Sequence, residues 1–379
     1  MKPEHPALFI GCILRQRDTD DQSRRGGYAG ATRRNRDRGR ERKPVKILRY
    51  APADDAAAAP RLGLLTGDGA HVADLTRACA RRLAARGDSG AEAAAAMRIP
   101  GDVAAFLAGG KTAWDALSET ADFLSSGDSE GLDGKPLLVS LDAVRLYAPV
   151  RPPKMIAVGR NYSEHMAEMR GAAPKEGPKV PSAWIKANST ICGPNDAIVK
   201  PHMTAMLDYE TELSLVIGAR CKDVPEDRAH EVIAGYTIVN DITARDVARI
   251  ERKEGNQLLG KMFDTFAPMG PCFVTADGIA DPMNLALRTR VNGEIRQDGN
   301  TGTMIWNVRQ LIAYLSQMTL EPGDVILTGT PSGVASGHKV EGENWFLQDG
   351  DVLESELEGI GTMRNRIVDE PDRTRSWQW

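Results

Sequence analysis

The stretch DYETELSLVI, residues 208–217, places three carboxylates at alternate positions directly before a run of apolar residues. Alternate side chains of a β-strand project from the same face, so Asp208, Glu210 and Glu212 are expected side by side. The apolar residues 213–217 predict that the same strand continues into a core. One end of a buried sheet would therefore carry an acidic face.

Carboxylates at this spacing repel one another unless a cation neutralises them. A further carboxylate, Asp241, follows the apolar segment 235–240 and would lie at the end of another strand. Ligands that offer only oxygen favour Mg²⁺, Mn²⁺ or Ca²⁺ over zinc. The pattern predicts a divalent cation site, and the alternative is a solvated strand face with alternating acidic residues.

The remaining pattern indicates an α+β fold dominated by β-structure. Short runs rich in β-branched residues alternate with glycine and proline, and long helices are few. One full amphipathic helix is predicted, at 307–316. The predicted strands of this region are 155–158, 213–217, 236–239, 325–327 and 352–358.

Composition divides the chain into four parts. Residues 1–44 hold 12 Lys and Arg against six Asp and Glu, which predicts a disordered basic extension over residues 1–45. Residues 46–150 begin with two strand-like runs around the turn Gly67–Gly69 and are expected to form a small β-rich domain, with an Ala-rich helical stretch at 75–105. The pair Pro152-Pro153 marks the boundary to a second, larger domain at 151–370, and residues 371–379 are expected to form a tail.

Several classes of protein are disfavoured by composition. The net charge is −4 and no basic stripe interleaved with aromatic residues is present outside the extension, which argues against a nucleic-acid partner. No apolar run approaches the roughly 20 residues needed to cross a bilayer. Five scattered cysteines suggest neither a disulfide framework nor a zinc site. A cytoplasmic protein is the expectation, and a targeting role for residues 7–14 is disfavoured by their flanking residues.

His165 and Glu168 lie three residues apart in a segment with helical propensity, and Ser163 could cap it. Residues at this spacing meet on one helix face. A carboxylate against the imidazole fixes its tautomer and raises its basicity, so the pair could take a proton from water. The alternative is a surface His beside a Glu. The Gly- and Pro-containing segment 171–181 that follows is either a lid or a plain surface loop.

These residues stand within five motifs that, in order, resemble the fumarylacetoacetate hydrolase family, over residues 151–368. The N-terminal unit resembles the small first domain of many members less distinctively. The motifs are VGRNY at 158–162 with the His and Glu just described, DYETEL at 208–213, DITARD at 241–246, KMFDTFAPMGP at 261–271 and LTGTPSGV at 327–334.

The resemblance implies a mixed β-roll catalytic domain, a homodimer, and Mg²⁺ or Mn²⁺ bound by two Glu and one Asp. Those ligands correspond to Glu210, Glu212 and Asp241, and Asp208 would support them without binding the ion. His165 would be the base, Glu168 its partner, and Lys261 the cation that stabilises a developing oxyanion. Arg160, Tyr162 and Thr330 would hold substrate oxygens.

The implied reaction is hydrolysis of a C–C bond in a small 2,4-dioxo acid, such as an acylpyruvate, a fumarylpyruvate or a diketo-deoxy sugar acid. The alternatives are an isomerase, decarboxylase or hydratase of a related oxo acid, such as a 5-carboxymethyl-2-hydroxymuconate isomerase, and a binding protein without turnover. Two departures bear on the substrate. Ala248 stands where many members have a substrate-contacting Gln, and Lys186-Ala187 replaces the usual Lys-Pro.

Overall fold

The computed structural model describes residues 44–125, 127, 130–170 and 178–371. Most of the predicted N-terminal extension, most of the segment 171–181 and all but the first residue of the predicted tail lie outside these residues. Within them no helix is long and apolar enough to cross a membrane.

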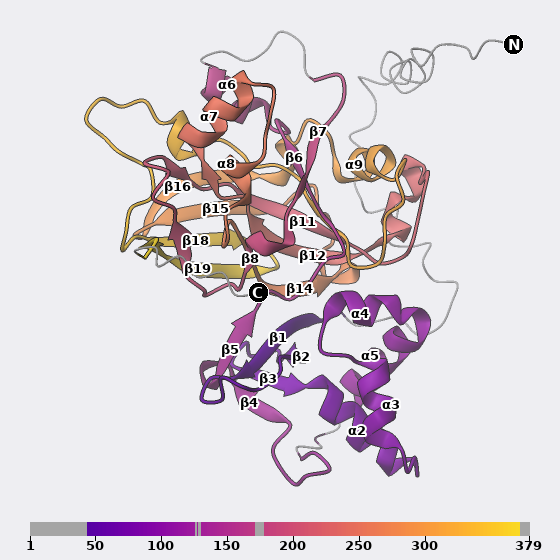
Figure 1. Cartoon of the computed structure of the whole chain (residues 1–379). Coiled ribbons are helices and arrows are strands. Elements are labelled where there is room, and N and C mark those ends of the chain that lie inside the picture. Colours follow the sequence, from indigo (N-terminus) through magenta and orange to yellow (C-terminus); the bar gives the residue numbers. More distant parts are fainter. Residues whose placement is uncertain (1–43, 126, 128–129, 171–177, 372–379) are drawn as a thin grey trace, which may run out of the picture.

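The N-terminal unit joins strands with a group of helices (Figure 1). Strands β2 and β3 form the predicted hairpin, with Leu65 opposite Val72. The Ala-rich stretch forms helices, and helix structure continues beyond it to residue 124. The elements are β1 (Lys46–Pro52), β2 (Arg61–Leu65), β3 (His71–Asp74), β4 (Leu138–Ser140), β5 (Val144–Tyr147), α2 (Leu75–Ala85), α3 (Ala91–Arg98), α4 (Val103–Ala108) and α5 (Gly110–Leu124).

The larger unit contains the strands predicted from the apolar runs. They are β6 (Met155–Gly159), β7 (Ser182–Lys186), β8 (Ile191–Cys192), β9 (Ile198–Lys200), β10 (Leu207–Asp208), β11 (Thr211–Ile217), β12 (Ile233–Asn240), β13 (Thr243–Ala244), β14 (Ala267–Thr275), β15 (Ala286–Val291), β16 (Glu294–Asn300), β17 (Val325–Leu327), β18 (Val352–Leu357) and β19 (Gly361–Asp369).

The helices of this unit are short. The predicted amphipathic helix is present as α9, and the side chains of Asn307 and Gln310 close a capping box at its N-terminus. The helices are α6 (Ser163–Arg170), α7 (Arg245–Lys253), α8 (Leu259–Met262) and α9 (Val308–Leu315), with 3-10 turns that include η3 (Asn188–Thr190) and η7 (Ala335–Gly337).

One twelve-stranded sheet runs through both units in the order β4-β3-β2-β1-β14-β12-β11-β17-β6-β7, with β5 paired to β1 and β8 to β14. The two units join at β1 and β14, where Lys46 lies opposite Val274. A five-stranded sheet, β16-β15-β18-β19-β9, packs beside the central strands. The expected α+β, strand-dominated fold is confirmed.

The centre of the large sheet is buried on both faces. Every residue of β11 and β12 is buried, including the polar ones. Strands buried on both faces lose the alternation that marks a half-exposed strand. Polar side chains at the ends of β11 and β12 are therefore held inside the protein, and each requires a partner.

Candidate functional site

Glu210, Glu212 and Asp241 come together as the sequence predicted. One ligand oxygen from each lies within 4.8 Å of the other two. Glu212 is on β11, and Asp241 follows β12 directly. The two strands pair antiparallel with Glu212 opposite Val239, and this pairing brings Asp241 close to Glu212. We refer to these three residues as the carboxylate cluster. It is buried, since the three residues are 6%, 2% and 0% exposed, so a solvated strand face is excluded.

Asp208 is not part of this cluster, and the expectation of one continuous strand through residues 208–217 is wrong. The strand breaks between β10 and β11, where the Asn240 side chain accepts a hydrogen bond from Glu210 N at 2.7 Å. Asp208 accepts hydrogen bonds from Ala335 N and Ser336 N at 2.7 and 3.0 Å. Its position outside the carboxylate cluster agrees with the supporting role predicted for it.

Three buried cations contact the carboxylates. Arg245, the first residue of α7, bridges Asp208 at 2.7 Å and Glu210 at 2.5 Å. The ammonium of Lys261 lies 2.6 Å from both Glu210 and Asp241. The pKa of Glu210 is consequently held below its ordinary value, because these two cations outweigh the opposing effect of burial.

Lys186 is the third cation, and it was not among the site residues predicted from the sequence. Its ammonium lies 2.8 Å from Asp241 and donates a hydrogen bond to the backbone carbonyl of Lys261. Burial lowers the pKa of Lys186, with Asp241 acting against this effect. Lys186 directly follows the exposed Ile185 on the edge strand β7, and this position did not indicate that its ammonium would reach the centre of the site.

Glu212 has a different environment from the other two carboxylates. It accepts a hydrogen bond from Gly329 N at 2.6 Å and makes no ion pair with a cation in the described part of the chain. Burial and the charges of Asp241 and Glu210 raise its pKa well above the ordinary value. The protein thus places one carboxylate where it is ionised with difficulty unless another positive charge is present.

The donor set fits a divalent cation. Four buried carboxylates, the cluster and Asp208, face only three buried cations, so the group has an excess of one negative charge at full ionisation. A hard cation takes oxygen ligands, and all three residues of the cluster offer carboxylate oxygen. Glu210, Glu212 and Asp241 are the residues that would hold it.

The His165–Glu168 pair lies on α6, with the two side chains 3.4 Å apart. His165 is close enough to Glu210 to contribute to the low pKa of that residue. Glu168 also accepts a hydrogen bond from Gly333 N at 3.0 Å, and the backbone of Gly337 packs against its carboxyl group. The structure therefore brings the predicted pair to the carboxylate cluster. Figure 1 shows α6, α7 and α8 gathered at one end of the large unit.

The three predicted substrate-binding residues have different surroundings. Tyr162 is 1% exposed, its hydroxyl has no hydrogen-bond partner among the described residues, and burial followed by the charge of Glu212 raises its pKa. Arg160 is exposed at a positive φ of 59°, a conformation that is strained for a residue with a side chain. Thr330 donates to Thr211 O and accepts from Gln297, both within 2.9 Å. Their contacts with substrate stay predictions.

The short helix α8 positions Lys261. The residue that holds the start of this helix, Glu251, was not predicted from the sequence. The carboxylate of Glu251 accepts hydrogen bonds from the backbone of Leu258, Leu259 and Gly260, the residues at the start of α8, at 2.7 to 3.1 Å. Glu251 thereby satisfies donors that a helix start leaves without partners. Nothing in the sequence distinguishes Glu251 from other acidic residues on a charged helix.

Ala248, which stands where many members of the resembled family have a Gln, is buried beneath this helix. A side-chain atom added at Gly260 would lie 2.6 Å from the Ala248 Cβ. The closeness of α7 and α8 therefore depends on a small residue at 248 and glycine at 260. A longer side chain at 248 would have to point elsewhere or separate the two helices.

Comparison with known proteins agrees with these features. The family model described as "Fumarylacetoacetate (FAA) hydrolase C-terminal" matches residues 154–368. A fumarylacetoacetate hydrolase domain-containing protein 2 homolog of Dictyostelium discoideum is 38% identical over 278 residues, covering 71% of this chain and 86% of that protein. The human mitochondrial oxaloacetate tautomerase FAHD2A is 44% identical over 228 residues, covering 59% of this chain and 70% of that protein.

Solved structures are similar over most of both chains. The 5-carboxymethyl-2-hydroxymuconate delta-isomerase of Mycobacterium smegmatis superposes with a TM-score of 0.59 at 32% identity, covering 86% of this chain and 100% of that chain. The maleylpyruvate hydrolase of Sphingobium sp. SYK-6, solved with manganese(II) and pyruvate, gives 0.61 at 26% identity, covering 86% and 99%. The resemblance drawn from the five motifs is thus confirmed, and the chain belongs to the fumarylacetoacetate hydrolase family.

Proposed function

We propose that this protein is a divalent-cation-dependent enzyme that hydrolyses a C–C bond in a small 2,4-dioxo acid. The observation that carries the proposal is the juxtaposition of the His165–Glu168 pair with the buried carboxylate cluster. A relative solved with manganese and pyruvate is named a maleylpyruvate hydrolase, which supports both the metal and the substrate class. Mg²⁺ and Mn²⁺ are the ions we propose, with Ca²⁺ as an alternative.

A cation held by Glu210, Glu212 and Asp241 would supply Lewis acidity to the carboxylate and 2-oxo oxygens of the acid. His165 would accept a proton from water as the water attacks the 4-carbonyl carbon. Glu168 Oε2 lies 3.4 Å from His165 Nδ1, from where it would orient the imidazole and stabilise its protonated form. After the C–C bond breaks, the same proton would go to the carbon of the departing pyruvate enolate.

Two further groups are suited to the negative charge that develops in this reaction. The Lys261 ammonium, between Glu210 and Asp241, would stabilise the enolate oxygen. The free hydroxyl of Tyr162, buried next to Glu212, is a donor without another partner among the described residues. We propose that it donates to a substrate oxygen. Arg160, at the exposed rim, would contact the outer carboxylate or carbonyl, and Thr330 is proposed as a weaker contact because its hydroxyl is already engaged.

Keto–enol tautomerisation of a 2-oxo acid is the second candidate, and a specific observation favours it. Relatives 41% and 44% identical to this chain are named oxaloacetate tautomerases. Such a reaction needs a base that moves a proton between carbon and oxygen, with no water attack. His165 could serve in this role with the same cation site. Isomerisation, as named for the Mycobacterium smegmatis neighbour, requires the same proton transfer.

A substrate panel separates the candidates. Purified protein with Mn²⁺ is incubated with acetylpyruvate and, separately, with the enol form of oxaloacetate, and both enol absorbance and released pyruvate are followed. Hydrolysis predicts one pyruvate for each acetylpyruvate consumed, abolished by chelator. Loss of the oxaloacetate enol signal without pyruvate, and no cleavage of acetylpyruvate, would replace hydrolysis by tautomerisation. Inactivity on every oxo acid of the panel would contradict both proposals.

We also propose a homodimer. Large apolar side chains are exposed near the site, with Ile250 67%, Ile185 54% and Leu258 52% accessible. Ile250 lies on α7 and Leu258 directly before α8, two helices that pack together. Exposed apolar side chains on neighbouring elements are typical of protein interfaces. Light scattering on the purified chain is expected to give twice the monomer mass, and the monomer mass at micromolar concentration would refute the dimer.

A further inference from the structure

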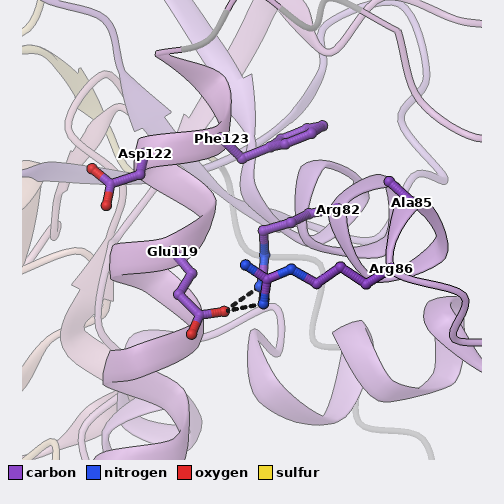
Figure 2. A pocket seen from close by; sticks show the side chains of 6 residues that line it. All are labelled: Arg82, Ala85, Arg86, Glu119, Asp122 and Phe123. Carbon is purple, nitrogen blue, oxygen red and sulfur yellow. Dashed lines mark hydrogen bonds and ion pairs between the residues drawn. The ribbon is translucent and has the colours of Figure 1, made fainter.

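Two cavities of similar size contain pairs of arginines, and they differ in how the charges are balanced. The first, of about 250 Å³, lies between α2 and α5 in the N-terminal unit. Figure 2 shows Arg82 and Arg86 converging on one oxygen of Glu119, with Asp122 on the same helix as the glutamate. The arginines of this cavity are therefore neutralised within the protein.

The second cavity, of about 230 Å³, lies where the two units meet. Arg49 of β1 and Tyr147 of β5 line it from the N-terminal unit. Arg151, Asn188 and Cys192 line it from the segment that follows. We call it the Arg49–Arg151 pocket. It is outside the candidate active site and contains none of the residues assigned there.

Neither guanidinium of this pocket makes an ion pair with a described carboxylate. Arg49 uses Nε to donate to Gly101 O at 3.1 Å, and no hydrogen bond to a described residue involves its two terminal nitrogens. Its guanidinium lies 5.5 Å from the centre of the Tyr147 ring. Arg151 is exposed, and among the described residues only its backbone N–H is bonded, to Asp102. Two guanidinium groups therefore border one cavity, and neither is paired with a carboxylate of the described residues.

The nearby carboxylates are engaged elsewhere. Asp102 accepts hydrogen bonds from Ala104 N and Ala105 N as the N-cap of α4, and from Arg151 N through its other oxygen. Asp196 pairs with Arg145 at 3.1 Å. The positive charge exceeds the negative charge by one among these five groups. Burial lowers the pKa of Arg49, and the charge of Arg151 lowers it further against the opposing effect of Asp102.

We propose that the Arg49–Arg151 pocket binds a small oxyanion, a carboxylate or a phosphate, between the two guanidinium groups. Planar guanidinium groups bind both kinds of oxyanion through paired hydrogen bonds, and an anion also relieves the repulsion between two like charges. The side-chain amide of Asn188 donates a hydrogen bond to Pro152 O at 2.7 Å. This bond connects two residues that line the pocket and so fixes its wall in place. Because the pocket is lined from both units, a bound anion would hold them together.

The test is calorimetric titration of the full-length protein with inorganic phosphate and, separately, with pyruvate. Chelator is present so that the carboxylate cluster carries no metal. We expect one site for each chain. Arg151→Gln should weaken binding by about tenfold or more, since a charge-assisted hydrogen bond contributes roughly 1.5–3 kcal/mol. Arg49→Lys keeps the charge but loses the planar fork, and it should also weaken binding.

Arg86→Gln is the matched control, because it removes an arginine from the cavity that Glu119 neutralises, and it should leave binding unchanged. Arg151 is exposed, so its replacement is not expected to unfold the chain, which the melting temperature without anion verifies. Tighter binding of pyruvate would identify a carboxylate site, and tighter binding of phosphate a phosphate site. Absence of binding by both anions, or equal binding in wild type and Arg151→Gln, would overturn the proposal.

Discussion

The carboxylate cluster and the His165–Glu168 pair lie in differently built parts of the same site. The cluster is set at the ends of two central strands, is almost completely buried, and is cross-bonded by Arg245 and Lys261. The pair lies on the eight-residue helix α6 at the rim, with both side chains partly exposed. The proposed metal binding would therefore depend on a rigid scaffold, and the proposed proton transfer on a short helix held by a few contacts.

The two parts are nevertheless connected through Asp208. This residue accepts hydrogen bonds from the backbone of η7 and pairs with Arg245, which in turn pairs with Glu210. The other end of η7 packs on Glu168 at Gly337. Asp208 thus belongs to a chain of contacts that runs from the carboxylate cluster to the His165–Glu168 pair. If the cluster binds the metal and the pair transfers the proton, substitutions in the two parts should separate metal affinity from turnover.

The largest effect is expected for Glu212→Ala. This change removes one of three ligands, so Mn²⁺ affinity should fall by about 100-fold or more and turnover should be lost with it. Calorimetry and activity measured at the same Mn²⁺ concentration check both. Glu231→Ala, which removes an exposed glutamate paired with Arg228, is the control and should change neither. Full Mn²⁺ affinity in Glu212→Ala would show that the ion binds elsewhere.

His165→Ala should lower turnover without weakening metal binding. Loss of the base is expected to lower kcat by about 10²- to 10⁴-fold, while Mn²⁺ affinity stays close to that of the wild type. His202→Ala, at an exposed position, serves as the control. Wild-type turnover after loss of His165 would remove it from the mechanism.

The pH dependence of metal binding tests the burial of Glu212. The pKa of Glu212 is higher in the folded protein than in the unfolded chain. As pH rises above the ordinary carboxyl pKa, this carboxyl group therefore ionises in the unfolded chain before it ionises in the folded protein, and the metal-free protein loses stability. Metal binding requires the ionised form, so Mn²⁺ affinity should rise by about tenfold per pH unit below that raised pKa. The increase in melting temperature caused by Mn²⁺ should therefore grow as pH rises from the ordinary carboxyl pKa toward the raised pKa of Glu212. An increase that does not depend on pH would contradict the assignment.

Gly337→Ala should disturb the proton-transfer pair alone. A Cβ at this position would lie 2.0 Å from the Glu168 carboxyl carbon, so Glu168 has to move away from His165. We expect kcat to fall by about tenfold with unchanged Mn²⁺ affinity, since small displacements of catalytic groups are costly. Gly67→Ala is the matched control because no atom lies within 4 Å of the added Cβ. Equal kcat values for the two variants would show that η7 does not position Glu168.

The smallest effect is expected for Glu251→Ala. Three backbone donors at the start of α8 lose their acceptor, and Lys261 becomes less well positioned. A decrease in kcat of several-fold, by less than about tenfold, is the expected result. The neighbouring exposed Glu254→Ala should have no effect. If the two variants behave alike, the contact at α8 does not contribute to catalysis.

The sequence predicted those parts of the site that depend on the spacing of residues within one strand or one helix. Alternation along a strand indicated Glu210 and Glu212, and helical spacing indicated the His165–Glu168 pair, because both patterns follow from backbone geometry within a few residues. The family motifs added Asp241 as the third ligand. The strand-dominated fold followed from the short β-branched runs.

What the sequence did not predict depends on contacts between distant residues. Lys186 reaches the backbone of Lys261, 75 residues later, and Gly333 binds Glu168 across 165 residues. The break before β11 has a similar origin, because the side chain of Asn240, 30 residues later, accepts the hydrogen bond of Glu210 N. None of these partners is set by local spacing, so only the folded chain shows them.

Whether the carboxylate cluster binds a metal ion can be seen in a crystal structure of the protein with Mn²⁺, with anomalous scattering recorded at the manganese edge. We expect one peak for each chain, within ligand distance of Glu210, Glu212 and Asp241. We also expect that the Lys261 ammonium no longer bridges Glu210 and Asp241. An intact Lys261 bridge with no peak at the three carboxylates, in protein saturated with Mn²⁺, would contradict metal binding by the cluster.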